Sequence, residues 1–392
     1  MMADEPSKFE GVSRRKFLAG ATAAGAVGLA GCGGGGDGGD TGGNGGDTGG
    51  NGGDTGGNST PMEEGLDTTP LTADGSSTVF PIANGGATVW GSNPEAGDQD
   101  YWLPSNWDDI YTEDMRLADY FANIYGYEPT GERSNPPFLV NVALSHSGTG
   151  VEAVESGRVD IGNSSGRVQD ELDRDSYEDF INHVVGVDGQ PIAVSSEIYD
   201  AGVTGITLEE LKQIYQGEIT NWSEVGGPDR EILVLGRAAG SGTSTAFRAN
   251  VFGNPDIQLS AIQNRYGQNQ QLRTAIANAD NAISYIALAF IDEPDADDAQ
   301  VVPISLEVEG TTYEYRGDPG LGAKAYPLSR DLHMYTWEDT SIKESAFINM
   351  FLTDYGQEVH VRGNNYFGIG PSRIETQKKN LAEPPNGFPM MQ

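Results

Sequence analysis

The chain has 392 residues, 37% of them hydrophobic, and its 58 acidic residues outnumber 23 basic ones to give a formal net charge of −35. A charge of this sign and size repels phosphate backbones and anionic lipid surfaces, which excludes nucleic-acid binding and adhesion to an anionic membrane surface. The single cysteine excludes an intrachain disulfide and a cysteine-based zinc site. An aromatic content of 9% indicates a folded chain. Carboxylates spread along a folded chain are typical of a protein from a halophile, because concentrated salt screens their repulsion.

Residues 1–31 are predicted to form a twin-arginine-type lipoprotein signal peptide. Arg14 and Arg15 precede an apolar run over 17–30, which is shorter than the roughly 20 residues that a membrane-spanning helix needs. The run ends in Leu-Ala-Gly before Cys32, which resembles a lipoprotein processing site. We therefore expect lipidation at Cys32 and a location on the outer face of the cytoplasmic membrane.

Residues 32–70 are predicted to form a tether. This stretch repeats Gly-Gly-Asp-Thr-Gly-Gly-Asn and has almost no apolar residue, so it cannot bury a core. The folded body is therefore expected from residue 71 onward.

Short apolar segments alternate with helical segments in the folded body. Strands are predicted at 139–144, 191–194 and 232–235, and helices at 208–215, 243–252 and 341–351. Strands that alternate with helices indicate an α/β fold with mixed sheets.

Three turns rich in Ser, Thr and Gly each follow a predicted strand and precede a helix. They cover residues 74–81, 145–150 and 236–244. Such turns present hydroxyl groups and free backbone N–H groups at the positive end of a helix dipole, which attracts anions. Three turns of the same chemistry indicate one oxyanion held by several helix ends. Arg167 and Arg237 stand beside such segments, and a guanidinium group binds a tetrahedral oxyanion through paired donors.

The sequence resembles the phosphate-binding proteins of ABC-type phosphate importers, which belong to the periplasmic-binding-protein type 2 family. The most specific segment is 206–229, which contains Gly-Glu-Ile-Thr-Asn-Trp at 217–222. Two further segments match by motif, namely Gly236-Arg237 with Gly-Ser-Gly-Thr at 240–243, and Ser-Gly-Thr-Gly at 147–150. The segments 160–167, 326–330 and 351–363 are also similar. The resemblance covers roughly residues 71–372.

The resemblance implies a two-lobed periplasmic-binding-protein-like fold with a hinge between the lobes. Lobe I would comprise 71–190 and 331–392, and lobe II would comprise 191–330. It implies a monomer that binds inorganic phosphate without catalysis or cofactor and delivers it to the membrane permease subunits of an ABC importer. The phosphate-binding residues carried over are Ser77, Thr78, the backbone N–H groups of Val79 and Phe80, Ser147, Ser164, Ser165, Arg167, Arg237, Ser241, Gly242 and Thr243.

The sequence departs from the family pattern at several positions. Some members place a carboxylate directly after the serine corresponding to Ser164, where it accepts the phosphate proton and excludes sulfate, but here Ser165 stands there. Some also pair the loop arginine with an aspartate two residues on, where this chain has Ala239. Gly166 is inserted before Arg167, and residues 91–115 form an insertion.

The same residues are compatible with other functions to different degrees. A binding protein for sulfate, molybdate or tungstate would use the same turns, and a surface lipoprotein without a ligand is a further alternative. A serine hydrolase would use Ser241, but Thr243 breaks the Gly-x-Ser-x-Gly motif, and none of the four histidines stands in a motif with Ser241. A nucleotide-binding loop at 148–153 has no Walker lysine. The acidic segment 292–298 is interpreted as a solvated loop rather than a calcium site, and no metal site is expected.

Overall fold

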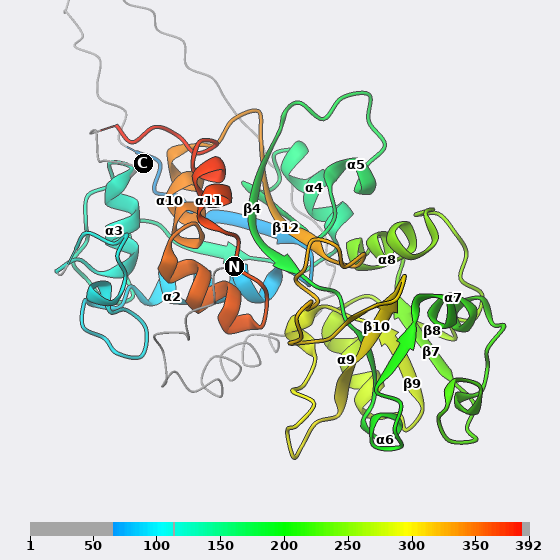
Figure 1. Cartoon of the computed structure of the whole chain (residues 1–392). Coiled ribbons are helices and arrows are strands. Elements are labelled where there is room, and N and C mark those ends of the chain that lie inside the picture. Colours follow the sequence, from blue (N-terminus) through cyan, green and yellow to red (C-terminus); the bar gives the residue numbers. More distant parts are fainter. Residues whose placement is uncertain (1–65, 113, 386–392) are drawn as a thin grey trace, which may run out of the picture.

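The computed structural model describes residues 66–112 and 114–385 and has a two-lobed α/β fold with two mixed sheets (Figure 1). The predicted signal peptide, with Arg14, Arg15 and Cys32, and the tether as far as residue 65 lie outside the described residues. Within the described ranges, no helix combines the length and the apolar character needed to cross a membrane.

The first sheet has five strands and both parallel and antiparallel pairs. Strand β1 pairs in parallel with β2 and β3, whereas β12 pairs antiparallel with β3 and β4. In spatial order its strands are β2 (Val140–Val142), β1 (Leu71–Gly75), β3 (Ile161–Ser164), β12 (Arg330–Trp337) and β4 (Phe180–Asp188).

The second sheet has seven strands and is also mixed. Strand β7 pairs in parallel with β8 and β9, and β10 pairs antiparallel with β5 and β11 and in parallel with β6. Its strands are β11 (Thr311–Tyr313), β10 (Val301–Val308), β5 (Ile192–Ser195), β9 (Ala282–Tyr285), β7 (Leu233–Arg237), β8 (Asn264–Tyr266) and β6 (Gly205–Thr207).

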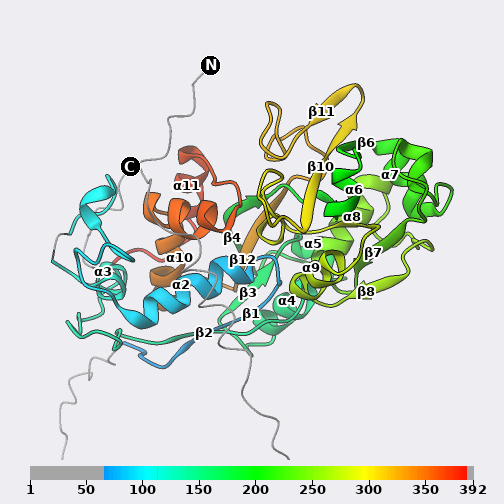
Figure 2. The same ribbon diagram turned by 90° about the horizontal axis from the view of Figure 1, so that it is seen from below.

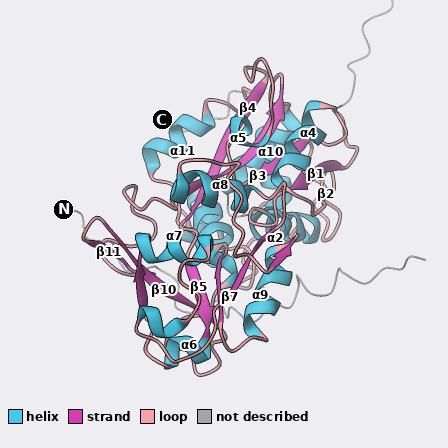
Figure 3. Cartoon of the chain, turned by 90° about the vertical axis from the view of Figure 1, so that its right-hand side faces the viewer, coloured by secondary structure: helices cyan, strands magenta, loops and turns pink. Residues whose placement is uncertain are grey.

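Helices surround both sheets, as the views in Figures 2 and 3 show. On the side of the first sheet lie α2 (Phe80–Ser92), the 3-10 turn η1 (Pro104–Asn106), α3 (Leu117–Ile124), α4 (Ser147–Glu155), α5 (Val168–Glu171), α10 (Ile342–Phe351), the π-helical η4 (Gly356–Val361), η5 (Arg362–Asn364) and α11 (Pro371–Lys378). On the side of the second sheet lie α6 (Ser196–Asp200), α7 (Leu208–Gln216), η2 (Trp222–Val225), α8 (Gly242–Phe252), α9 (Asn269–Ala277) and η3 (Leu288–Phe290).

The predicted elements are present with small shifts in their bounds. The segment 139–144 forms only the short strand β2, and the helix predicted at 208–215 extends one residue to Gln216. A capping box of Thr207 and Glu210 starts this helix, and Gly217 ends it in the left-handed conformation at φ 82°. Local capping chemistry thus accounts for the bounds of α7.

The chain passes from the first sheet to the second between β4 and β5, and it returns between β11 and β12. After β12, the segment with α10, η4 and α11 packs back against the elements of the first sheet. The predicted lobe boundaries, after residues 190 and 330, lie beside these two crossings and stay a prediction, as does the hinge.

The inserted segment 91–115 packs against the C-terminal part of the chain. Trp102 is buried, and its ring lies edge-on to Tyr355 with centroids 5.1 Å apart. Trp107 meets the same Tyr355 ring at 5.7 Å. This aromatic contact gives the insertion a structural role in packing against Tyr355, the residue just before η4.

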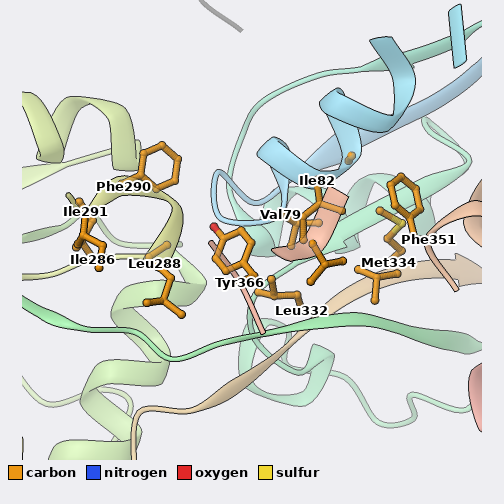
Figure 4. Close-up of a cluster of buried hydrophobic side chains, with 14 of the residues drawn as sticks. Val79, Ile82, Ile286, Leu288, Phe290, Ile291, Leu332, Met334, Phe351 and Tyr366 are labelled. Atoms are coloured by element: carbon orange, nitrogen blue, oxygen red, sulfur yellow. The ribbon is translucent and has the colours of Figure 1, made fainter. Parts of the chain in front are cut away.

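Apolar packing fixes the turn that follows β1. Figure 4 shows Val79 and Ile82, at the start of α2, facing Leu332 and Met334 of β12. All four side chains are buried. The start of α2 is therefore held against the sheet by hydrophobic contacts, which positions the polar residues just before it.

Candidate functional site

The first polar turn connects β1 to α2. Gly75 has φ 136° and lies against the Asn163 carbonyl of β3, where any side chain would clash. Ser77 and Thr78 follow it and are buried. The Phe80 N–H group, predicted as a ligand donor, donates to the Ser76 carbonyl at 2.9 Å, and Val79 occupies the N-cap position of α2.

The second polar turn lies at the start of α4 and joins the end of β3. Ser147 Oγ accepts a hydrogen bond from the Ser165 backbone N–H at 3.2 Å and lies 3.3 Å from Ser165 Oγ. Ser76 Oγ donates to Ser165 Oγ at 3.0 Å, which joins this turn to the first. Ser164 Oγ instead donates to the Gly166 carbonyl at 2.7 Å, within its own turn.

The third polar turn connects β7 to α8. Arg237 is the last residue of β7, Ser241 is the N-cap of α8, and Gly242 and Thr243 form its first turn. The side chains of Arg237, Ser241 and Thr243 are all buried. The strand–turn–helix arrangement predicted for this segment is present.

Hydrogen bonds join the turns of the two sheets directly. Arg237 Nη2 donates to Ser77 Oγ at 3.0 Å, and Thr78 Oγ1 lies 3.1 Å from Thr243 Oγ1. Asn269, the first residue of α9, donates through Nδ2 to Ser77 Oγ and Thr78 Oγ1, both at 3.1 Å. The polar turns predicted from separate parts of the sequence therefore form one buried cluster, which we call the hydroxyl cluster: Ser76, Ser77, Thr78, Ser147, Ser165, Arg237, Thr243 and Asn269.

Arg237 is a buried cation whose partners are all neutral. Nε donates to the Tyr266 carbonyl at 3.2 Å, and Nη2 donates to the Gly267 carbonyl at 2.6 Å. Across the described ranges, no carboxylate forms a salt bridge with Arg237. Burial lowers the pKa of Arg237 to about 10, so the group is still charged at neutral pH. An unpaired buried charge is costly, and a bound anion would compensate it.

Arg330 is a second arginine at the cluster that the sequence analysis did not identify. It is the first residue of β12, and its Nη2 lies 2.7 Å from Asp188 Oδ2 and 3.1 Å from Thr243 Oγ1. Its Nη1 is buried and has no hydrogen-bond partner within the part of the chain that the structure describes. The Tyr-Pro-Leu-Ser-Arg segment at 326–330 resembles the family, but nothing in its spacing indicates a role in binding.

Arg167 lies apart from the hydroxyl cluster. Its side chain is 71% exposed, and its guanidinium group pairs with Asp170 at 2.8 Å and 3.0 Å. The Asp170 carboxylate raises the pKa of Arg167 through this hydrogen-bonded contact. The structure thus gives this predicted ligand a surface ion pair in place of a contact with the other predicted residues.

Glu171 is a further residue that sequence reasoning missed, besides Asn269 and Arg330. Its Oε1 is buried and lacks a hydrogen-bond partner among the described residues. A methyl group placed on Gly242 would meet Ser147 Oγ at 2.5 Å and Glu171 Oε1 at 2.7 Å, so this carboxyl group adjoins the cluster. Burial raises the pKa of Glu171 to about 8.

Two of the alternatives raised from the sequence, a serine hydrolase and a calcium site, involve Ser241 and the acidic segment 292–298. In the described part of the chain, no histidine hydrogen-bonds to Ser241, and no three His, Cys, Asp or Glu side chains are grouped to hold a metal ion. In the acidic segment 292–298, the Asp292 carboxylate pairs with Arg273 at 2.8 Å and accepts the backbone N–H groups of Gln300 and Val301.

The fold and the cluster together define a class of protein, the two-lobed α/β binding proteins. The chain belongs to the PBP superfamily, because the superfamily domain matches residues 124–354, more than half of the sequence. The periplasmic-binding-protein superfamily expected from the sequence is thereby confirmed.

Curated relatives and solved structures agree with this assignment. The phosphate-binding protein PstS of Bacillus subtilis is 27% identical over 240 residues, which cover 61% of this chain and 74% of that protein. A putative phosphate ABC transporter substrate-binding protein from Clostridium perfringens, solved with bound phosphate, superposes with a TM-score of 0.55 at 20% identity, covering 77% of this chain and all of that one. An ABC-type phosphate transport receptor from Vibrio cholerae gives a TM-score of 0.50 at 20% identity, with 76% and 100% coverage. These relatives are named as binding and transport proteins, and the structural likeness confirms the predicted fold.

Proposed function

We propose that this chain is an extracytoplasmic solute-binding protein that captures inorganic phosphate and delivers it to the permease of an ABC importer. The observation that carries the proposal is Arg237, a buried guanidinium group with no carboxylate partner in the described ranges, surrounded by hydroxyl groups from both sheets. The relatives named above are phosphate-binding proteins, which supports phosphate as the ligand.

The proposed ligand contacts divide between the two sheets. Ser77, Thr78 and Ser147 would contribute hydroxyl groups from the side of the first sheet. Arg237 would contribute a paired donor from the second sheet, together with the N-terminal turn of α8 at 242–243. Neither side surrounds an anion alone, so binding would require the lobes to close around it.

Arg330 extends the proposed site by one cation. Its unpartnered Nη1 and its contact with Thr243 place a second guanidinium group beside the same hydroxyls. Two arginines next to buried hydroxyl groups suit a tetrahedral dianion better than a neutral solute. Another oxyanion, such as sulfate, molybdate or tungstate, is the alternative ligand of the same class.

Isothermal titration of the purified protein with phosphate, sulfate and arsenate tests the ligand. We expect one phosphate per chain, with a matching rise in melting temperature. Heat from sulfate and none from phosphate would reassign the ligand.

The membrane anchor is a further part of the proposal and rests on the sequence alone. Arg14, Arg15 and Cys32 support twin-arginine export followed by lipidation. Replacing both arginines by lysine is expected to leave the precursor in the cytoplasm, and Cys32→Ser is expected to abolish lipid anchoring. Membrane retention of the Cys32→Ser protein at the wild-type level would refute the anchor.

A further inference from the structure

Asn269 brings an amide group into the hydroxyl cluster from the side of the second sheet. It is the first residue of α9, and its side chain is fully buried. Nδ2 has two hydrogens and donates one to Ser77 Oγ and one to Thr78 Oγ1, both at 3.1 Å. Oδ1 is buried and has no hydrogen-bond partner among the described residues. The amide therefore contributes only donors to the cluster.

The oxygen of Ser77 is approached by donors from the second sheet. Arg237 Nη2 lies at 3.0 Å, Asn269 Nδ2 at 3.1 Å and the Asn269 backbone nitrogen at 3.4 Å. A hydroxyl oxygen has two lone pairs, so these donors occupy both. Within the described ranges, each hydrogen bond of Ser77 Oγ is one that it accepts. The hydroxyl hydrogen of Ser77 is therefore available to a group bound in the cluster.

The hydroxyl group of Thr78 is in a similar position. Its Oγ1 accepts from Asn269 Nδ2 and, at 3.4 Å, from Arg330 Nη2. Thr243 Oγ1 lies 3.1 Å away, but Arg330 Nη2 at 3.1 Å and Arg237 Nη1 at 3.4 Å approach that oxygen as well. Both threonine oxygens thus have their lone pairs directed at N–H donors, and an anion would accept the hydrogens of both hydroxyl groups.

The direction of these hydrogen bonds matters because an acceptor at the position of the Asn269 amide nitrogen would take the hydrogens of Ser77 and Thr78 for itself. We propose that Asn269 is a positioning residue that directs the hydroxyl hydrogens of Ser77 and Thr78 toward the bound anion. It acts from the second sheet on hydroxyl groups of the first, so the hydrogens are directed only when the two sides are together. This inference rests on the proposed function and adds a residue that acts through Ser77 and Thr78.

The test is a comparison of phosphate affinities, measured by calorimetry at one pH and one salt concentration, in two backgrounds. One is the wild type, and the other is the double variant Ser77→Ala with Thr78→Val, which lacks both hydroxyl groups. In the wild type, Asn269→Ala is expected to weaken phosphate binding about tenfold, the effect of one charge-assisted hydrogen bond. In the double variant it is expected to change the affinity less than about twofold, because the groups through which Asn269 acts are absent.

Asn269→Asp separates the direction of the hydrogen bonds from a simple bridge between the sheets. The carboxylate accepts both hydroxyl hydrogens and adds a negative charge. Repulsion of phosphate occurs in both backgrounds, but capture of the hydrogens needs the hydroxyl groups. The loss of affinity is therefore expected to be about tenfold larger in the wild type than in the double variant. A residue that only bridged the sheets would cause equal losses, since a carboxylate bridges them too.

Asn278→Asp is the matched control for the added charge. Asn278 is exposed at the other end of α9, so this variant is expected to bind phosphate as the wild type does. If the double variant binds phosphate too weakly to titrate, Ser77→Ala alone replaces it. The loss caused by Asn269→Ala is then expected to be at least threefold smaller than in the wild type.

Two results would overturn the inference. One is a loss from Asn269→Ala that is the same in both backgrounds, which indicates a merely structural role. The other is a loss from Asn269→Asp that is no larger in the wild type than in the double variant, and this comparison decides the question if Asn269→Ala does not fold. A wild-type protein that does not bind phosphate is a separate outcome, which removes the proposed function itself.

Discussion

Arg237 at the end of β7 donates a hydrogen bond to Ser77 Oγ, 3.0 Å away in the turn after β1. The two residues are 160 positions apart in the chain and belong to the sides of different sheets. This contact joins a cation from one side to a hydroxyl group from the other. The geometry of the proposed anion site therefore depends on the relative position of the two sheets.

The buried pair of Arg330 and Asp188 is expected to be essential for stability. Both side chains are almost fully buried, and removing one partner leaves the other charge without compensation. Arg330→Ala is expected to lower the free energy of unfolding by about 3–5 kcal/mol, as measured by urea denaturation.

Two further variants complete this test. Arg330→Met combined with Asp188→Asn removes both charges and is expected to recover part of the loss. Arg373→Ala breaks a half-exposed pair with Asp331 and is expected to cost less than about 1 kcal/mol. Equal losses for Arg330→Ala and Arg373→Ala would contradict the importance of burial at Arg330.

The parts of the site that local sequence indicates are the three strand–turn–helix segments. Ser77, Ser147 and Thr243 each lie close in sequence to the strand and helix that position them, so a short pattern of small polar residues predicts them. Asn269 and Arg330 could not be predicted in this way. They meet Ser77 and Thr78 across 192 and 252 positions, and only the folded arrangement of the two sheets brings them together.

Arg167 is the opposite case, a residue that the sequence predicts as a ligand but that lies in a surface ion pair. An arginine that follows Ser164 and Ser165 matches the expected chemistry, but Gly166 separates them. Its side chain pairs with Asp170 at the surface, a local contact that sequence similarity does not reveal. Glu171 was missed because it lies outside the segment 160–167 that resembles the family, and only the fold brings its carboxyl group beside Gly242.

Arg167→Ala is accordingly expected to leave phosphate binding almost unchanged. An exposed ion pair contributes no more than about 1 kcal/mol, so the affinity should change less than about fivefold. Calorimetry with the variant and the wild type at the same salt concentration measures this change. A larger loss would return Arg167 to the site and imply a different conformation of residues 164–170 with ligand bound.

His360 is expected to make the protein sensitive to acid. Its ring is buried between Phe351 and Tyr355, neither ring nitrogen has a partner within the described ranges, and burial lowers its pKa to about 3. The unfolded chain therefore takes up a proton below about pH 6.5 that the folded chain does not, and stability is lost as the pH falls.

His360→Phe isolates this effect from the opposite contributions of Glu171 and Glu344, whose pKa values burial raises to about 8 and about 7. As the pH falls from 6 to 4, the free energy of unfolding of the variant relative to that of the wild type should increase by about 1.4 kcal/mol for each pH unit. Urea denaturation across this range measures it, and a constant difference would show that His360 does not titrate on unfolding.

The net charge of −35 is expected to make stability depend on salt. Carboxylates repel one another at low ionic strength, and the Debye length shortens from about 10 Å at 0.1 M salt to about 3 Å at 1 M. The melting temperature should therefore rise steeply between about 0.1 M and 2 M salt. A melting temperature that does not change over this range would contradict the interpretation of the chain as adapted to concentrated salt.

Phosphate titration of Arg237→Ala tests the central claim most directly, with Arg237→Lys as the conservative variant and the exposed Arg265→Ala as the control. The loss of a desolvated charge-assisted contact costs about 2–5 kcal/mol, so affinity should fall about 30-fold to several thousand-fold. Lysine should rescue it only in part, because an ammonium group cannot reproduce the paired donors, and Arg265→Ala should bind as the wild type does. A folded Arg237→Ala protein that binds phosphate within about fivefold of the wild type, the range of a surface ion pair, would contradict the account.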